Sequence, residues 1–192
     1  DPGDTNRLGE LGSLFSQPYH IELDSNDILY VLDRGANSVK VLNSEFEITH
    51  QFAVGGSHYG ANFPNMQFNS NDDLYLSYNH GDVKQLQKYS KDGDGFAPWL
   101  RPTTYFFIDK SDNLYFPIYD EPDETGHQTQ YGQNVDVYSP NGNKIKTIEG
   151  IWIPITQDDD GNFYSINRLD HTIIKYNSDF EKLFEVGTRE DG

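Results

Sequence analysis

The amino-acid sequence predicts an all-β fold of four-stranded antiparallel sheets that repeat along the chain as the blades of a β-propeller. The first observation is a seven-residue segment that occurs four times and ends at Tyr30, Tyr75, Tyr115 and Tyr164, with spacings of 45, 40 and 49 residues. The second is that short apolar segments alternate with clusters of Asp, Asn, Ser and Gly, and none has a helical period. Four short strands in a unit of about 40–45 residues are typical of a propeller blade.

The composition excludes several classes of protein. The chain has 192 residues, a formal net charge of −17, 14% aromatic residues and no cysteine. This length suits one domain or one stretch of repeats, and the aromatic content is too high for a disordered acidic chain. Without cysteine, neither a disulfide framework nor a cysteine zinc site can form. No apolar segment approaches the roughly 20 residues that a membrane helix needs, and the negative charge disfavours nucleic acid as a partner.

Each repeated segment begins with Asp or Asn and predicts a tight turn between two strands. The four segments are Asp24–Tyr30, Asn69–Tyr75, Asp109–Tyr115 and Asp158–Tyr164. Asp, Asn and Ser side chains hydrogen-bond to nearby backbone, and Asp, Asn and Gly tolerate left-handed dihedral angles. The four tyrosines recur in register, so we expect them to pack between blades.

The strands of each repeat are expected in a fixed order around these turns. The first strand precedes the turn: His20–Leu23, Met66–Phe68, Tyr105–Ile108 and Ile153–Ile155. The second strand follows it: Leu29–Leu32, Leu74–Tyr78, Leu114–Ile118 and Phe163–Ile166. The third strand ends before another turn cluster, at Leu42, Tyr89, Tyr138 and Tyr176. The fourth strand closes the repeat: Thr49–Val54, Gly95–Leu100 (the weakest), Lys144–Ile148 and Lys182–Val186.

The repeats divide the chain into a linker and four blades. We expect an N-terminal linker segment at 1–17, then blades within 18–192, at about 18–56, 63–100, 102–150 and 153–187. Three arrangements remain open: a closed four-bladed ring, part of a larger ring, or an open arc completed by another copy. The first residue is Asp1 rather than Met, which we interpret as a processed or excised segment. An extracellular, cell-surface or periplasmic location is compatible with that interpretation.

The first repeat resembles an NHL-type repeat. The residues that carry the resemblance are Gly9-x-x-Gly-x-x-Phe15-x-x-Pro18, then Asp24, then Leu29-Tyr30-Val31-x-Asp33. The resemblance extends from about Gly9 to Gly187 and implies a propeller related to the NHL, SMP-30 and six-bladed groups. In that family the Asp three residues after the Tyr usually pins the loop of the blade. The later repeats depart from the pattern, with Tyr78, Ile118 and Asn167 at this position.

Charged residues sort onto the two ends of the predicted blades. The turns between first and second strands and between third and fourth strands collect Asp residues, whereas the opposite loops collect all five arginines and five of the six histidines. Asp suits turns and Arg solvates well, so one interpretation gives this sorting no function. The alternative is a binding face, since Arg presents a planar fork to carboxylates, phosphates and carbonyl groups. The candidate contacts are Arg34, Arg168, Arg101, His20, His80, Asp120 and Tyr131, with the inserted loop Glu121–Gly132.

The sequence contains two kinds of candidate metal site, Asp-rich loops and histidines. Asp158-Asp-Asp160-Gly161 and Asp92-Gly-Asp94-Gly95 look like loops for calcium or another divalent ion. Neither has the full spacing of a calcium loop, and both lie where the repeat needs a turn, so we predict no cofactor. Propeller lactonases and lyases place metal ligands near the central channel, and the histidines could do so here. They lack any short spacing such as His-x-x-x-His, and no pair of carboxylates stands out as catalytic.

The predicted function is therefore non-enzymatic: an extracytoplasmic interaction or scaffold module that uses its Arg/His-bearing loops. The partner would be a protein, a carbohydrate or copies of the chain itself. The acidic face of one copy could meet the Arg-bearing face of the next, which would build a ring or a filament head to tail. The alternative function is a metal-dependent propeller lactonase or lyase.

Overall fold

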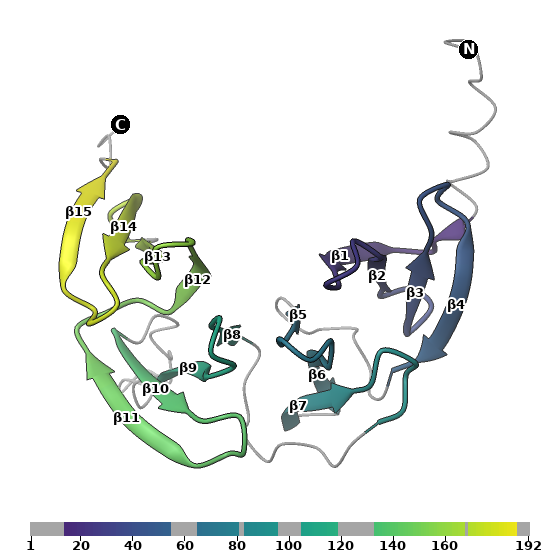
Figure 1. Ribbon diagram of the computed structural model, residues 1–192, viewed down its shortest axis with the longest axis horizontal. Coiled ribbons are helices and arrows are strands. Elements are labelled where there is room, and N and C mark those ends of the chain that lie inside the picture. The colour runs from purple at the N-terminus through teal and green to yellow at the C-terminus, as the bar shows by residue number, and fades with distance from the viewer. Residues whose placement is uncertain are drawn as a thin grey trace, which may run out of the picture. The chain divides into compact units, whose positions relative to one another are not determined.

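The computed structural model describes residues 14–54, 65–80, 83–95, 105–118, 133–167 and 169–187 (Figure 1). These residues form the fifteen strands β1–β15 in four antiparallel sheets. The chain divides into two compact units, Asp1–Thr104 and Tyr105–Gly192. The first unit contains β1–β4, which form sheet 1, and β5–β7, which form sheet 2. The second unit contains β8–β11, which form sheet 3, and β12–β15, which form sheet 4. This confirms the all-β class predicted from the repeats.

Sheets 1 and 2 are simple meanders in which consecutive strands pair. Sheet 1 has the order β1 (Pro18–Leu23), β2 (Leu29–Asp33), β3 (Ser38–Leu42) and β4 (Ile48–Ala53). Sheet 2 has the order β5 (Met66–Phe68), β6 (Leu74–His80) and β7 (Val83–Tyr89). The fourth strand expected at Gly95–Leu100 is represented by a single bridge between Tyr89 and Gly95, and 96–100 lie outside the described residues.

Sheets 3 and 4 repeat the same meander. Sheet 3 has the order β8 (Phe107–Ile108), β9 (Leu114–Ile118), β10 (Asn134–Tyr138) and β11 (Lys144–Glu149). Sheet 4 has the order β12 (Pro154–Gln157), β13 (Phe163–Asn167), β14 (Thr172–Tyr176) and β15 (Lys182–Val186). The predicted third-strand ends are confirmed, whereas β8 is shorter than expected because it begins at Phe107 and not at Tyr105.

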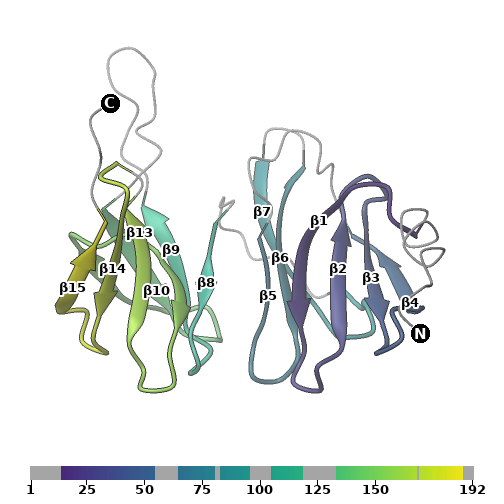
Figure 2. The same cartoon turned by 90° about the horizontal axis from the view of Figure 1, so that it is seen from above.

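One turn design follows the first strand and the third strand of every sheet. Each of the eight turns closes with two backbone hydrogen bonds, for example from the Asp24 amide to the Ile28 carbonyl and from the Asp27 amide to the Asp24 carbonyl. The first residue is always Asp, Asn or Ser. The fourth residue has a positive φ and is Asp27, Phe46, Asp72, Gly93, Asp112, Gly142, Gly161 or Phe180. Figure 2 shows these turns at one end of the sheets within each unit.

The first side chain of each strand-one-to-two turn explains the repeated heptapeptide. Asp109 Oδ1 accepts hydrogen bonds from the amides of Ser111 and Asn113 at 2.9 and 2.8 Å. The hydroxyl of Tyr115 donates to Asp109 Oδ2 at 2.9 Å, and Tyr164 donates likewise to Asp158 at 3.0 Å. The six-residue spacing thus places a turn-forming carboxylate under a tyrosine hydroxyl in sheets 3 and 4.

Each unit has its own core between two sheets. In the first unit, Tyr30, Leu32 and Val39 of sheet 1 pack with Met66 and Leu76 of sheet 2. In the second unit, residues of sheet 3 pack with sheet 4 and with the segment before it; the buried members are Phe107, Tyr115, Val135, Val137, Ile151, Trp152, Phe163, Ile174, Tyr176 and Phe180. Tyr30 and Tyr115 are buried in these cores, which confirms the packing role predicted for them, whereas Tyr75 is buried outside both clusters and Tyr164 is only half-buried.

Candidate interaction surfaces

A buried carboxylate fixes the segment that enters sheet 1. Asp33, at the end of β2, accepts hydrogen bonds from the amides of Ser16 and Gln17 at 2.9 and 2.8 Å. The ammonium of Lys40 on β3 donates to the same carboxylate at 2.7 Å, and both side chains are buried. Burial opposes ionisation of Asp33, but the hydrogen bonds from Lys40, Gln17 and Ser16 outweigh it and lower the pKa of this carboxyl. Asp33 therefore holds the segment that enters sheet 1, and we call this group the Asp33 pin.

The pinned segment places a charged and an aromatic side chain together, and we call this group the Arg34 corner: Tyr19, His20, Glu22 and Arg34. The amide of Arg34 donates to the Gln17 carbonyl at 2.9 Å, and its guanidinium lies 5.6 Å from the centre of the Tyr19 ring. His20 Nε2 lies 3.7 Å from a carboxylate oxygen of Glu22. The neighbouring Gly35 has no room for a side chain, because a Cβ there would lie 2.4 Å from Ser16 Oγ.

The corner contains two of the predicted contact residues, Arg34 and His20. Arg101, Asp120, Tyr131 and Arg168 lie outside the described residues, and so does the insertion 121–132. His80 ends β6, but its side chain also lies outside the described part. Their predicted participation in one binding face therefore stays a prediction.

Sheet 4 has no counterpart of the Asp33 pin at the matching position. Asn167, which ends β13, accepts hydrogen bonds from the amides of Leu169 and Asp170 at 3.0 and 3.2 Å and donates to the Asp170 carboxylate at 2.7 Å. It orders the loop that follows, whereas Asp33 holds the segment that precedes. In sheet 4 the preceding segment is instead held by Ser165, whose hydroxyl donates to the Trp152 carbonyl at 2.9 Å.

The Asp158–Asp160 turn uses its first carboxylate for local structure. Asp158 accepts hydrogen bonds from the Asn162 amide at 2.8 Å, from the Tyr164 hydroxyl at 3.0 Å and from the Lys175 ammonium at 3.0 Å. The side-chain amide of Asn162 also donates to Asp158, at 3.0 Å. This bond above all, together with the others, lowers the pKa of Asp158. Asp160 is exposed beside it. In the described part of the chain, no three His, Asp or Glu side chains form a group that could hold a metal ion.

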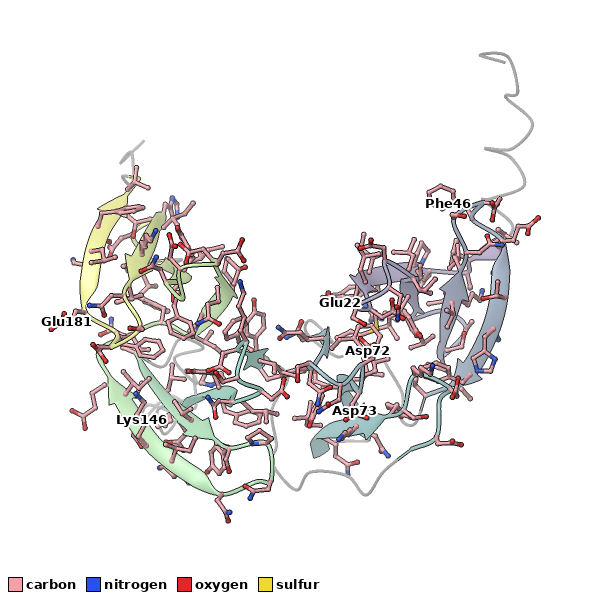
Figure 3. The ribbon with its side chains drawn as sticks, in the orientation of Figure 1. Glu22, Phe46, Asp72, Asp73, Lys146 and Glu181 are labelled. Atoms are coloured by element: carbon pink, nitrogen blue, oxygen red, sulfur yellow. The ribbon has the colours of Figure 1, made fainter. Side chains whose placement is uncertain are left out.

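Turns of neighbouring sheets are linked at the acidic end of each unit. In the first unit the amide and hydroxyl of Ser25 donate to the two carboxylate oxygens of Asp72, at 2.9 and 2.7 Å. In the second unit Lys110 donates from its amide to the Gln157 side chain at 3.0 Å and pairs through its ammonium with Asp159 at 2.5 Å. Asp72 (labelled in Figure 3) and Asp159 thus each bind a neighbouring turn within their own unit.

The face of sheet 4 that points away from its core carries exposed apolar side chains. Cross-strand pairing aligns Ile166 with Ile173 and Ile173 with Val186, and it aligns Tyr164 with Lys175 and Lys175 with Phe184. Ile166, Ile173, Phe184 and Val186 are all exposed, between 41% and 57%. We name this group, Tyr164, Ile166, Ile173, Lys175, Phe184 and Val186, the outer face of sheet 4.

Sequence reasoning sorted only the charged residues and missed this face. The signal was present in the alternation of the strands: Ile166 follows Tyr164 by two positions, and Ile173 precedes Lys175 by two. Since side chains alternate across a strand, such pairs lie on one face of the sheet. An exposed apolar group of this kind marks a surface that binds another macromolecule more often than ordinary solvent-exposed surface does.

The chain is similar in structure to known β-propellers, although no protein-family profile and no curated protein matches it. Virginiamycin B lyase from Staphylococcus aureus has a TM-score of 0.58 at 11% identity, over 89% of this chain and 55% of the lyase. A streptogramin B lyase gives 0.58 at 15% identity, over 89% and 54%. A chain of a nidogen/laminin complex gives 0.60 at 16% identity, over 89% and 64%.

These likenesses show a β-propeller fold, which confirms the predicted fold class, with each sheet as one blade. The chain spans little more than half of the two lyases, 55% and 54% of their lengths. The NHL and SMP-30 resemblance stays a prediction. No helix in the described residues is long and apolar enough to cross a membrane.

Proposed function

We propose that this protein is a non-enzymatic, extracytoplasmic interaction module that binds a protein partner through the Arg34 corner. The observation that carries the proposal is the guanidinium of Arg34, which lies over the Tyr19 ring at a corner fixed by the buried Asp33–Lys40 pair. Part of the cost of ordering a flexible arginine is thereby met before any partner arrives.

The chemistry of the corner favours an acidic group on the partner. Arg binds carboxylates through two parallel hydrogen bonds, and an aromatic face beneath it orients the guanidinium plane. Tyr19 is exposed and can add apolar contact area, as tyrosines do at protein interfaces. His20 and Glu22 follow Tyr19 on β1, and their pair would add a mixed charge that discriminates between partners.

The fold comparisons support a protein as the partner. One of the similar structures is a complex of two proteins, nidogen and laminin, which places a propeller of this general form in a protein-binding context. A carbohydrate and another copy of the chain are the two alternative partners. Head-to-tail contact between the acidic end and the arginine-bearing end of two copies remains part of the proposal.

Charge reversal at the corner tests the proposal. Immobilised wild-type protein and the Arg34→Glu variant are compared for capture of proteins from the extracellular and periplasmic fractions of the source cells. Arg34→Lys keeps the charge but loses the fork, and Lys91→Glu makes the same charge change at an exposed turn. We expect one captured protein to be lost with Arg34→Glu, weakened with Arg34→Lys and retained with Lys91→Glu. Capture that is equal for all four proteins would refute the role of the corner.

A metal-dependent lactonase or lyase is the second candidate, and it is favoured by the two similar structures that are lyases. Metal analysis of the purified protein discriminates between the candidates. A stoichiometric metal that is lost in His20→Ala would favour the enzyme over the interaction module.

A further inference from the structure

The two units contain a template for how one blade binds the next. In the second unit, Tyr115, Val135 and Val137 of sheet 3 lie against sheet 4 and are buried there. In the first unit, Tyr30, Val39 and Val41 occupy the same positions of sheet 1 and are buried against sheet 2. A blade of this chain therefore uses these positions to hold the blade that follows it.

Sheet 4 has the same positions, and no described residue of the second unit covers them. Tyr138 and Tyr176 end the third strands, so Val137 corresponds to Lys175 and Val135 to Ile173. The partners across the fourth strand are Lys146 on sheet 3 and Phe184 on sheet 4. The outer face of sheet 4 is thus a blade-binding face by position, and its Ile173 is 48% exposed where Val135 is fully buried.

Blade binding also uses one residue of the turn between the third and fourth strands. In sheet 4 this residue is Phe180, which is 9% exposed and stacks on Phe163 with ring centres 4.4 Å apart. Phe180 reaches the preceding blade as well: its ring centre lies 5.8 Å from that of Tyr115, and the Lys146 ammonium lies 5.4 Å from its centre. The turn therefore inserts an aromatic ring between a tyrosine and a lysine of the neighbouring sheet.

Sheet 1 carries an almost identical turn that has no such neighbour. Asn43-Ser-Glu-Phe46-Glu47 matches Asn177-Ser-Asp-Phe180-Glu181, and the two phenylalanines have φ values of 61° and 65°. Phe46 is nevertheless 56% exposed, at the margin of sheet 1 (Figure 3). Ile21 and Leu23 of β1, at the opposite edge of sheet 1, are exposed too.

Charged residues border both surfaces. Phe46 lies between Glu45 and Glu47, which are both exposed. On the outer face of sheet 4, Lys175 is paired with Asp158 at 3.0 Å, and the exposed Lys182, two residues before Phe184, is paired with Glu185 at 3.0 Å. The covered turn in the second unit shows the same combination, with Asp179 and Glu181 beside Phe180 and Lys146 against its ring.

We propose that the outer face of sheet 4 binds sheet 1 of a second copy of the chain, with Phe46 of that copy inserted against Phe184 and Tyr164. The inference rests on the proposed interaction role and names a self-partner and a separate surface for it. The contact is heterologous, since it joins different surfaces of the two copies, and it extends to rings or filaments. It joins blade faces side by side, unlike the end-to-end contact of acidic and arginine-bearing loops.

Complementary variants test this contact on the purified full chain. Phe46→Lys removes the inserted ring and leaves the outer face of sheet 4 intact, whereas Ile173→Lys does the reverse. Ile145→Lys is the matched control, because Ile145 is 53% exposed but lies on β11 of sheet 3. Sedimentation velocity gives the mass of each protein up to about 100 μM, a range that detects weak complexes. Circular dichroism verifies that each variant keeps its sheets.

The expected results separate this contact from other associations. Wild type and Ile145→Lys grow in mass with concentration, and each of the other two variants associates at least about 10-fold more weakly. An equimolar mixture of Phe46→Lys and Ile173→Lys forms a dimer and nothing larger, since the mixture holds one intact contact. A wild-type chain that stays monomeric, or a Phe46→Lys chain that associates like wild type, would overturn the proposal. The readout is the mass of the chain alone, so it can fail while capture of another protein through the Arg34 corner succeeds.

Discussion

The turns at residues 43–47 and 177–181 have nearly the same sequence and the same backbone, yet their phenylalanines have opposite environments. In both, the Asn side chain accepts hydrogen bonds from the amides two and four positions later, at 3.1 and 2.9 Å for Asn43 and at 3.0 and 2.8 Å for Asn177. Phe180 is buried in an aromatic cluster, and Phe46 is exposed. The difference teaches that turn conformation is local here, whereas burial depends on the neighbouring blade.

The two turns also differ in whether packing offsets their backbone strain. A phenylalanine with positive φ is strained, by about 1–2 kcal/mol for a non-glycine residue. For Phe180 this strain is offset by stacking on Phe163 and by contact with Tyr115. For Phe46 the described residues of the first unit provide no such stacking, so the strain is not offset in this way.

The largest expected effect comes from truncating the buried phenylalanine. Phe180→Ala should lower the free energy of unfolding by about 3 kcal/mol, because it removes a buried ring and leaves the backbone strain in place. Phe46→Ala should change it by less than about 0.5 kcal/mol. Urea denaturation of both variants measures the difference, and equal losses would contradict the assigned environments.

Gly93 occupies the same turn position in sheet 2, and its substitution should have the next largest effect. Its φ is 89°, and a Cβ there would lie 2.3 Å from Cγ of Phe52 on sheet 1. Gly93→Ala combines strain with overpacking and should lower the free energy of unfolding by about 2 kcal/mol. Gly161→Ala, with φ of 83° and no atom closer than 4.0 Å, is the control that keeps the strain alone. Equal losses for the two variants would show that the approach of Phe52 is unimportant.

The local part of the comparison predicts two equal effects. Asn43→Ala and Asn177→Ala each remove the acceptor of two turn amides, and each should lower the free energy of unfolding by about 1 kcal/mol. Asp at either position would keep the acceptor and most of the stability. Denaturation midpoints that differ strongly between the two alanine variants would show that the turns are not equivalent.

Replacement of the exposed phenylalanine by glycine should give a small gain. Phe46→Gly relieves the positive-φ strain and loses little buried area, although glycine adds freedom to the unfolded chain. The net increase in the free energy of unfolding should be about 0.5 kcal/mol, measured at low protein concentration where copies do not associate. Phe180→Gly should instead be destabilising, so a stabilised Phe180→Gly would refute the contrast.

Titration of the buried tyrosines should detect the removal of Phe180, and the tyrosines should make the free energy of unfolding depend on pH only at alkaline pH. Burial, and then the Asp109 carboxylate, raise the pKa of Tyr115 beside Phe180, and burial raises the pKa of Tyr30 to about 12. Because these folded-state pKa values exceed the ordinary value near 10, their stabilising contribution is complete below about pH 10 and is lost as the pH rises. Phe180→Ala should lower the pKa of Tyr115 and leave that of Tyr30 unchanged, as measured by ultraviolet absorbance of tyrosinate.

Much of the fold follows from local pattern. The heptapeptides predict the strand-one-to-two turns because Asp24, Asn69, Asp109 and Asp158 act on amides no more than four residues away. Of the Arg34 corner, the sequence predicted only Arg34 and His20, as two of the charged residues on one end of the blades. The contact of Arg34 with Tyr19 depends on the segment that Asp33 holds, and that hydrogen bond spans seventeen residues of sequence.

By itself the sequence determined the strands, the turns and their order, since these depend on alternation and on hydrogen bonds within five residues. Only the tertiary structure decided which of two matching phenylalanines is buried and which sheet face lacks a cover. The physical reason is that removal of apolar surface from water needs a second surface, and that surface is supplied by residues far away in the chain or by another molecule.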